Sequence, residues 1–154
     1  MSPGGLNLDF EASALDGWIR HQVGGLSGDM LLEPIGGGQS NPTFFVSYGQ
    51  RQMVLRKQPP GPVLPSAHAV DREHRVMAAL KDSAVPVPEM LAYCDDRSVI
   101  GTPFYLMSRV QGRVFGDCAL PGVDPQHRRQ MYLAMAEMLA KLHQVDWQGR
   151  GLGD

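Results

Sequence analysis

The chain has 154 residues, 43% of them hydrophobic, which is enough for one domain with a buried core. Its 14 Lys and Arg against 16 Asp and Glu give a formal net charge of -2, so we expect binding neither to nucleic acid nor to an anionic membrane. The sequence starts without a secretory signal, has no apolar run of the roughly 18 residues that span a membrane, and places Cys94 and Cys118 far apart, so we expect a cytoplasmic protein without a cysteine metal site.

The first predicted element is a helix. Residues 1–8 carry no periodic pattern, and we expect a disordered start there. Within residues 9–23 the apolar residues recur at the spacing of one helical face: Leu15, Trp18, Ile19 and Val23. Gly24 and Gly25 end this pattern, and Trp18 is expected to anchor the helix in the core.

A glycine-rich stretch, residues 31–58, carries the first chemical signal. Apolar runs at 31–35, 43–48 and 53–55 predict three strands, with a tight turn at Gly49 between the second and the third. The loop between the first two strands holds Gly36, Gly37, Gly38, Gln39, Ser40 and Asn41, and the third strand ends in Arg56 and Lys57. A glycine loop between antiparallel strands, followed by a cation, is one way to hold nucleotide phosphates.

A proline-rich connector at 58–65 precedes a predicted helix that runs from an N-cap at Ser66 to about residue 81. Glu73 lies on the apolar stripe of this helix and needs a partner if it is buried. Arg56 or Lys57 would serve, and a neighbour on the same helix or solvent is the alternative.

The remaining elements are two strands and a long helix. Apolar runs predict strands at 89–94 and 103–110, with a turn at 95–98 between them. A helix over 124–145 begins with an Asp-Pro signal, and its apolar face is expected to pack in the core: Met131, Met135, Met138, Leu139 and Leu142.

The order of these elements excludes two common nucleotide-binding motifs. Asn41 stands where a dinucleotide fingerprint requires its third glycine, and a strand rather than a helix follows. No Gly-Lys-Ser or Gly-Lys-Thr follows the glycines, so the loop is not a P-loop. A glycine loop, a cation on the third strand and a carboxylate on the next helix form the arrangement of kinases.

Five segments together resemble a known family: GGGQSNPTF, VLRKQPPG, LPSAHAVDREHRVMAAL, PFYLMSRVQGRV and LAKLHQVD. They look like the N-terminal lobe of the aminoglycoside/choline-kinase-like phosphotransferases, most of all the subgroup found alone in bacteria or fused ahead of acyl-CoA dehydrogenase domains. The resemblance implies an α+β fold with a five-stranded antiparallel sheet, one helix before it, one inserted after the third strand, and a long helix after it. It divides the chain into the start at 1–8, a kinase-like lobe at 9–112, and a linker with the long helix at 113–154.

The resemblance also implies a site for ATP. Residues 37–41 would cover the triphosphate, and Arg56 would be the third-strand cation that contacts it. Glu73 would pair with Arg56, while Lys57 points to the other face of the strand. At the adenine end, Met107 would be the gatekeeper, and main-chain groups of Ser108 and Val110 would bond the edge of the base.

The family's catalytic loop and metal-binding Asp have no counterpart in this sequence. The family carries a His-Gly-Asp…Asn loop, whereas the late histidine segment 143–146 matches a structural part of the family pattern. We therefore expect the chain to be part of a longer small-molecule kinase that phosphorylates a hydroxyl group, to lack activity alone, and to need a C-terminal lobe for Mg²⁺.

Two other readings stay open at this point. The chain could be a non-catalytic kinase-like binding module, or an unrelated α+β domain whose glycine loop is a simple hairpin turn. We also expect self-association through the helix at 124–145, because its methionine-rich face, with Met131, Met135 and Met138, needs a cover.

Overall fold

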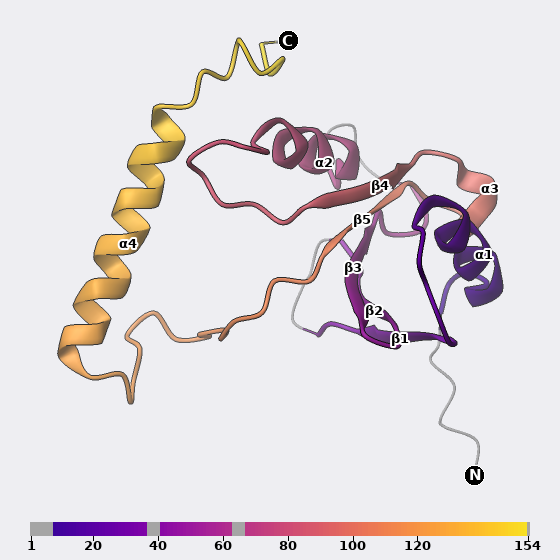
Figure 1. Ribbon diagram of the computed structural model, residues 1–154, viewed down its shortest axis with the longest axis horizontal. Coiled ribbons are helices and arrows are strands. Elements are labelled where there is room, and N and C mark those ends of the chain that lie inside the picture. The colour runs from indigo at the N-terminus through magenta and orange to yellow at the C-terminus, as the bar shows by residue number, and fades with distance from the viewer. Residues whose placement is uncertain (1–7, 37–40, 63–66, 154) are drawn as a thin grey trace. The chain divides into compact units, whose positions relative to one another are not determined.

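A computed structural model describes residues 8–36, 41–62 and 67–153 (Figure 1). The chain divides into two compact units, residues 1–78 with 88–109, and residues 79–87 with 110–154. None of the described helices is long and apolar enough to cross a bilayer.

The first unit is built on one antiparallel sheet. Its strands are β1 (Met30–Pro34), β2 (Thr43–Tyr48), β3 (Arg51–Lys57), β4 (Met90–Cys94) and β5 (Phe104–Ser108). They lie in the order β1-β2-β3-β5-β4, and each neighbouring pair is antiparallel. This confirms the predicted α+β fold with five antiparallel strands and a helix, α2 (Val70–Ala79), inserted after the third.

Side chains alternate between the two faces of the sheet, and α1 (Ala12–Gln22) covers one of them. Leu15 and Ile19 of α1 are fully buried in the core with the inward side chains of the strands: Phe44, Val46, Tyr48, Met53, Leu55, Phe104 and Leu106. Trp18 packs edge-on against Phe104, with ring centroids 4.8 Å apart, so it anchors the helix as expected. The opposite face carries Thr43, Phe45, Val54, Arg56, Tyr105 and Met107.

Several predicted boundaries shift for local reasons. α1 begins at Ala12 rather than residue 9, because Glu11 is extended and Asp9 forms an ion pair with Lys57. α2 begins at Val70, after His68 in a left-handed conformation with φ 58°, and the predicted cap Ser66 lies outside the described residues. The strand expected to reach residue 110 ends at Ser108.

The turn predicted at 95–98 is wrong, because a short helix, α3 (Arg97–Ile100), forms there. The Asp96 side chain accepts a hydrogen bond from the Ser98 N–H at 2.8 Å, which satisfies one free donor of the helix start. Gly101 closes α3 in the left-handed region with φ 82°.

The second unit contains α4 (Pro125–His143). Asp124 caps its start by accepting hydrogen bonds from the N–H groups of Gln126 and His127. Arg150 joins the two segments of the unit, since its Nη1 donates to the carbonyls of Ala79 at 2.7 Å and Lys81 at 3.0 Å.

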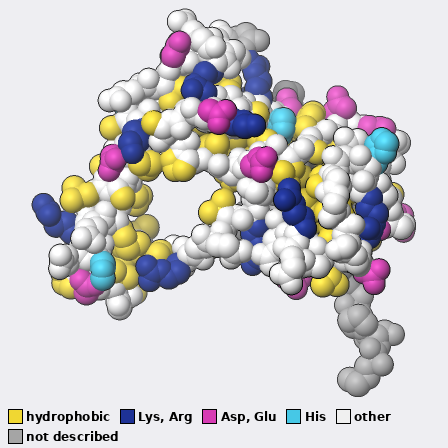
Figure 2. Space-filling view, viewed as in Figure 1, with side chains coloured by type: hydrophobic (Ala, Val, Ile, Leu, Met, Phe, Trp, Pro, Cys, Tyr) yellow, Lys and Arg dark blue, Asp and Glu magenta, His cyan; other side chains and the backbone are white. Residues whose placement is uncertain are grey.

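The apolar face of α4 is not a core, which corrects the expectation for its methionine stripe. No residue of α4 is buried, and Met135 is 65% exposed. Figure 2 shows hydrophobic side chains exposed along this helix, with acidic and basic side chains interspersed over the visible surface. Self-association through this helix stays a prediction, as does the division of the chain after residue 112.

Candidate functional site

The site is centred on an ion pair between the end of β3 and the first turn of α2. Arg56 Nε donates to Glu73 Oε2 at 2.7 Å, and Arg56 Nη2 donates to Oε1 at 3.2 Å, so the guanidinium grips the carboxylate with two bonds. The first helical turn also favours an acidic side chain electrostatically. The ion pair expected between these two residues is therefore present, and its role toward a nucleotide stays a prediction.

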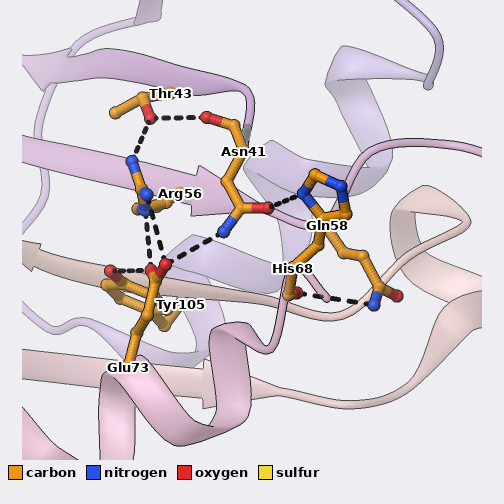
Figure 3. Close-up of polar contacts among 7 residues, drawn as sticks. All are labelled: Asn41, Thr43, Arg56, Gln58, His68, Glu73 and Tyr105. Atoms are coloured by element: carbon orange, nitrogen blue, oxygen red, sulfur yellow. Dashed lines mark hydrogen bonds and ion pairs between the residues drawn. The ribbon is translucent and has the colours of Figure 1, made fainter. Parts of the chain in front are cut away.

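Two further donors hold the Glu73 carboxylate (Figure 3). Tyr105 of β5 donates its hydroxyl to Oε2, and Asn41 donates from Nδ2 to Oε1, both at 3.0 Å. Burial alone would raise the pKa of Glu73, but the hydrogen bonds from Arg56, Tyr105 and Asn41 and the charge of Arg56 outweigh it, so that pKa lies below its ordinary value. Glu73 is therefore a carboxylate at neutral pH.

Two partners of the Glu73 carboxylate, Arg56 and Tyr105, are held in their protonated forms. The hydrogen bond to Glu73 raises the pKa of Arg56 above its ordinary value, so the guanidinium stays charged. Burial, and then the charge of the Glu73 carboxylate, raise the pKa of Tyr105, so its phenol keeps the proton that it donates.

Thr43 closes a ring of hydrogen bonds between the loop and the two elements. Its Oγ1 accepts from Arg56 Nη1 at 3.2 Å and donates to the Asn41 carbonyl at 3.0 Å. The path thus runs from the Asn41 side chain through Glu73, Arg56 and Thr43 back to the Asn41 backbone (Figure 3). Asn41 is 3% exposed, so it belongs to the interior of this arrangement.

Lys57, next to Arg56 in the chain, lies on the other face of the sheet. Its ammonium donates to Asp9 Oδ2 at 2.6 Å and lies 5.4 Å from the centre of the Phe10 ring, and the side chain is fully buried. Because successive side chains of a strand point to opposite faces, Lys57 cannot reach the Glu73 side of the sheet.

A pocket of about 800 Å³ opens beside the ion pair, within the first unit. Its polar wall contains Asn41, Arg56, His68, Arg72 and Glu73, and the rest is lined by Ala69, Val76, Met77, Pro88, Tyr105 and Met107. It combines apolar surface with a small set of convergent polar groups, as small-molecule sites do.

The three predicted adenine-binding positions, Met107, Ser108 and Val110, all lie among the described residues. Met107 lines the pocket. Ser108 is tied to Glu89 by two bonds, since its N–H donates to the Glu89 carbonyl at 2.9 Å and its Oγ accepts from the Glu89 N–H at 3.0 Å. Its N–H is thus already used. Val110 is 69% exposed and is the first residue of the second unit after β5.

The predicted phosphate loop, by contrast, is described only at its end. Gly37, Gly38, Gln39 and Ser40 lie outside the described residues, and Asn41 is the first residue that follows them.

Sequence reasoning missed Tyr105, Thr43 and His68 at this site. Tyr105 lies directly opposite Arg56 in the β3–β5 register, so alternation along the strand at 103–110 could have placed its hydroxyl beside the cation. Thr43 also lies opposite Arg56, on β2. His68 has no comparable signal, because a left-handed residue between a connector and a helix follows no period.

The model of the "Phosphotransferase enzyme family" matches residues 31–154 of the chain. Acyl-CoA dehydrogenase family member 11 of Gallus gallus is 50% identical over 138 residues, which are 90% of this chain and 17% of that protein. Acyl-CoA dehydrogenase family member 10 of Mus musculus is 46% identical over 140 residues, 90% of this chain and 13% of that protein. The chain thus spans less than a fifth of the length of these two relatives.

One solved structure is similar over almost the whole chain. It is assigned as an aminoglycoside phosphotransferase of Ralstonia eutropha JMP134, and it is 43% identical with a TM-score of 0.79. The similarity covers 94% of this chain and 41% of that one.

Proposed function

Because the chain belongs to the phosphotransferase enzyme family, we propose that it is the ATP-binding part of a small-molecule kinase that phosphorylates a hydroxyl group. The observation that carries this proposal is the ion pair between Arg56 and Glu73. In kinases a carboxylate on the helix after the third strand orients the cation that contacts the nucleotide phosphates.

The hydrogen-bonding capacity of Arg56 supports the role proposed for it. A guanidinium has five N–H donors, and Arg56 uses three, two toward Glu73 and one toward Thr43. Five less three leaves two N–H groups for phosphate oxygens. Glu73 holds the plane of the guanidinium, so these two donors are oriented before a ligand arrives.

The remaining residues that we propose for the site contact the triphosphate or the adenine. We assign residues 37–41 to the triphosphate and Met107 to the wall behind the adenine. The backbone of Ser108 and Val110 bonds the edge of the base. Since the Ser108 N–H is already donated to Glu89, Ser108 contributes its carbonyl and Val110 contributes the N–H.

Mg²⁺, which such kinases use with ATP, does not fit the described residues of this chain. They contain no group of three or more His, Cys, Asp or Glu side chains that could hold a metal ion. Glu73 already accepts four hydrogen bonds from three side chains. We therefore propose that metal binding and phosphoryl transfer need residues beyond those that the structure describes.

We do not propose a dehydrogenase activity, although two of the similar proteins are named as acyl-CoA dehydrogenase family members. The chain matches 13% and 17% of those proteins, while the phosphotransferase model matches residues 31–154 of this chain. The acceptor we propose is a small molecule with a free hydroxyl group.

The test is a titration of the ¹⁵N-labelled chain with ATP, following backbone amides by NMR. We expect shifts at Asn41, Met107 and Val110. Arg56→Met should weaken binding by roughly tenfold or more, since a charge-assisted hydrogen bond contributes about 1.5–3 kcal/mol. Arg51→Met is the matched control, because Arg51 is an exposed arginine at the other end of β3. Unchanged amide positions at millimolar ATP, in a chain whose spectrum is that of a folded protein, would refute ATP binding.

A further inference from the structure

Asn41 is held in one orientation by the groups around its side-chain amide. Ionised Glu73 can only accept hydrogen bonds, so the NH₂ group of Asn41, and not its oxygen, faces the carboxylate. The amide oxygen Oδ1 therefore points the other way, to His68 Nδ1 at 3.1 Å (Figure 3).

This orientation fixes the proton on the His68 ring. Oδ1 of Asn41 is an acceptor, so His68 Nδ1 must carry the hydrogen that joins them. In the neutral ring the other nitrogen, Nε2, then has no hydrogen. The carboxylate of Glu73 thus determines the tautomer of a histidine that it does not contact, through a single buried amide.

The backbone of His68 is fixed as well. Its carbonyl accepts hydrogen bonds from the Val70 N–H at 2.9 Å and from Gln58 Nε2 at 3.5 Å. Its φ of 58° is in the left-handed region, which histidine enters more readily than most residues but still at a cost. The ring is therefore presented to Asn41 from a tightly specified position between β3 and α2.

From this geometry we infer that His68 is a positioning residue. His68 holds the Asn41 amide, the Asn41 amide holds the Glu73 carboxylate, and Glu73 orients Arg56. We call the chain from His68 through Asn41 to Glu73 the Asn41 bridge. The bridge connects Asn41, at the end of the glycine-rich loop, to α2. Loss of the His68 hydrogen bond therefore loosens the orientation of Arg56.

The effect of the bridge on nucleotide affinity rests on the proposed function, whereas the bridge itself does not. The first measurement is therefore the ¹⁵N spectrum of the imidazole ring without ligand, at about pH 8, where an ordinary histidine is neutral. We expect the hydrogen on Nδ1 of His68. A hydrogen on Nε2 would overturn the inference whatever the chain binds.

Two variants then separate the side chain from the backbone. His68→Gly removes the donor and relieves the left-handed strain, but it also removes the ring from the pocket and frees the backbone, so the hydrogen bond is judged by what His68→Asn restores. His68→Asn places an amide NH₂ near the position of Nδ1 and tolerates the left-handed conformation. We expect His68→Gly to move the side-chain NH₂ resonances of Asn41 and to weaken ATP binding by roughly 2- to 10-fold, the value of one hydrogen bond. His68→Asn should restore both.

The outcomes distinguish the two proposals. Asn41 resonances that stay in place in His68→Gly would overturn the bridge. An equal loss of ATP affinity in both variants would overturn the positioning role of His68. If the tautomer and the Asn41 resonances behave as expected but the unmodified chain binds no ATP, the bridge stands and the proposed function fails.

Discussion

Removing the Asp9 carboxylate should destabilise the first unit far more than its position near the chain start suggests. The Asp9→Ala variant leaves the Lys57 ammonium fully buried and without its partner at 2.6 Å. Breaking a buried ion pair on one side costs about 3–5 kcal/mol. Because the Asp9 side chain is 34% exposed and water can approach the pair, we expect the lower end, about 3 kcal/mol.

Exchanging the lysine for an apolar side chain should remove this cost. Lys57→Met takes the buried charge away and leaves Asp9 partly solvated, so we expect it to change the free energy of unfolding by about 1 kcal/mol or less. In the Lys57→Met background, Asp9→Ala should then cost almost nothing. The difference between the two backgrounds is the coupling energy of the pair.

Urea unfolding followed by the fluorescence of Trp18, which packs on Phe104 in the same core, measures each variant. Glu11→Ala is the control, because Glu11 is an exposed carboxylate two residues away with no capping hydrogen bond. A loss below 1 kcal/mol for Asp9→Ala, as for exposed ion pairs, would refute the reasoning. An equal loss in the Lys57→Met background would show that Asp9 does not act through Lys57.

Three further predictions concern single groups, and urea unfolding checks each. The folded-state pKa of Glu73 lies below its ordinary value of 4.5, so the ionised side chain stabilises the fold above pH 4.5 and this stabilisation is lost as the pH falls below that value. Glu73→Gln should flatten this part of the profile of unfolding free energy against pH. An unchanged slope in the variant would contradict this prediction. Tyr105→Phe removes the hydroxyl that donates to Glu73 and should cost about 1.5 kcal/mol, whereas a loss near zero would mean that the bond contributes nothing. Gly101→Ala forces a side chain into the left-handed region with no atoms within 4 Å to clash, so a cost of about 1 kcal/mol would be conformational alone, and no cost would contradict that assignment.

Local pattern was enough to predict the positions of the five strands and the opposite directions of Arg56 and Lys57. Alternation along a strand is a local property, so adjacent residues could be assigned to opposite faces without any knowledge of their partners. The family resemblance added the antiparallel arrangement of the sheet and the choice of Glu73 as the partner of Arg56. The match of residues 31–154 to the phosphotransferase family confirms that resemblance.

Partners that depend on tertiary structure could not be predicted in the same way. Lys57 pairs with Asp9, which is 48 residues earlier and stands in a stretch read as part of a helix. The partners of the Asn41 side chain, Glu73 and His68, are 32 and 27 residues away in the chain, so no local pattern indicates them. The short helix α3 was missed because four residues do not reveal a helical period, although Asp96 and Gly101 have the composition of its caps.

The opposite directions of Arg56 and Lys57 also bear on how this stretch can change in evolution. Deleting or inserting one residue within β3 would turn every later side chain of the strand to the other face. A deletion would bring the lysine to the face of Glu73, and an insertion would bring the larger, forked arginine into the closed space beside Asp9 and Phe10. Point substitutions can be compensated one at a time, but such a change in strand length alters the surroundings of both cations, Arg56 and Lys57, at once. We therefore expect the number of residues between the turn at Gly49 and Arg56 to stay constant among related chains, even where the residues themselves differ.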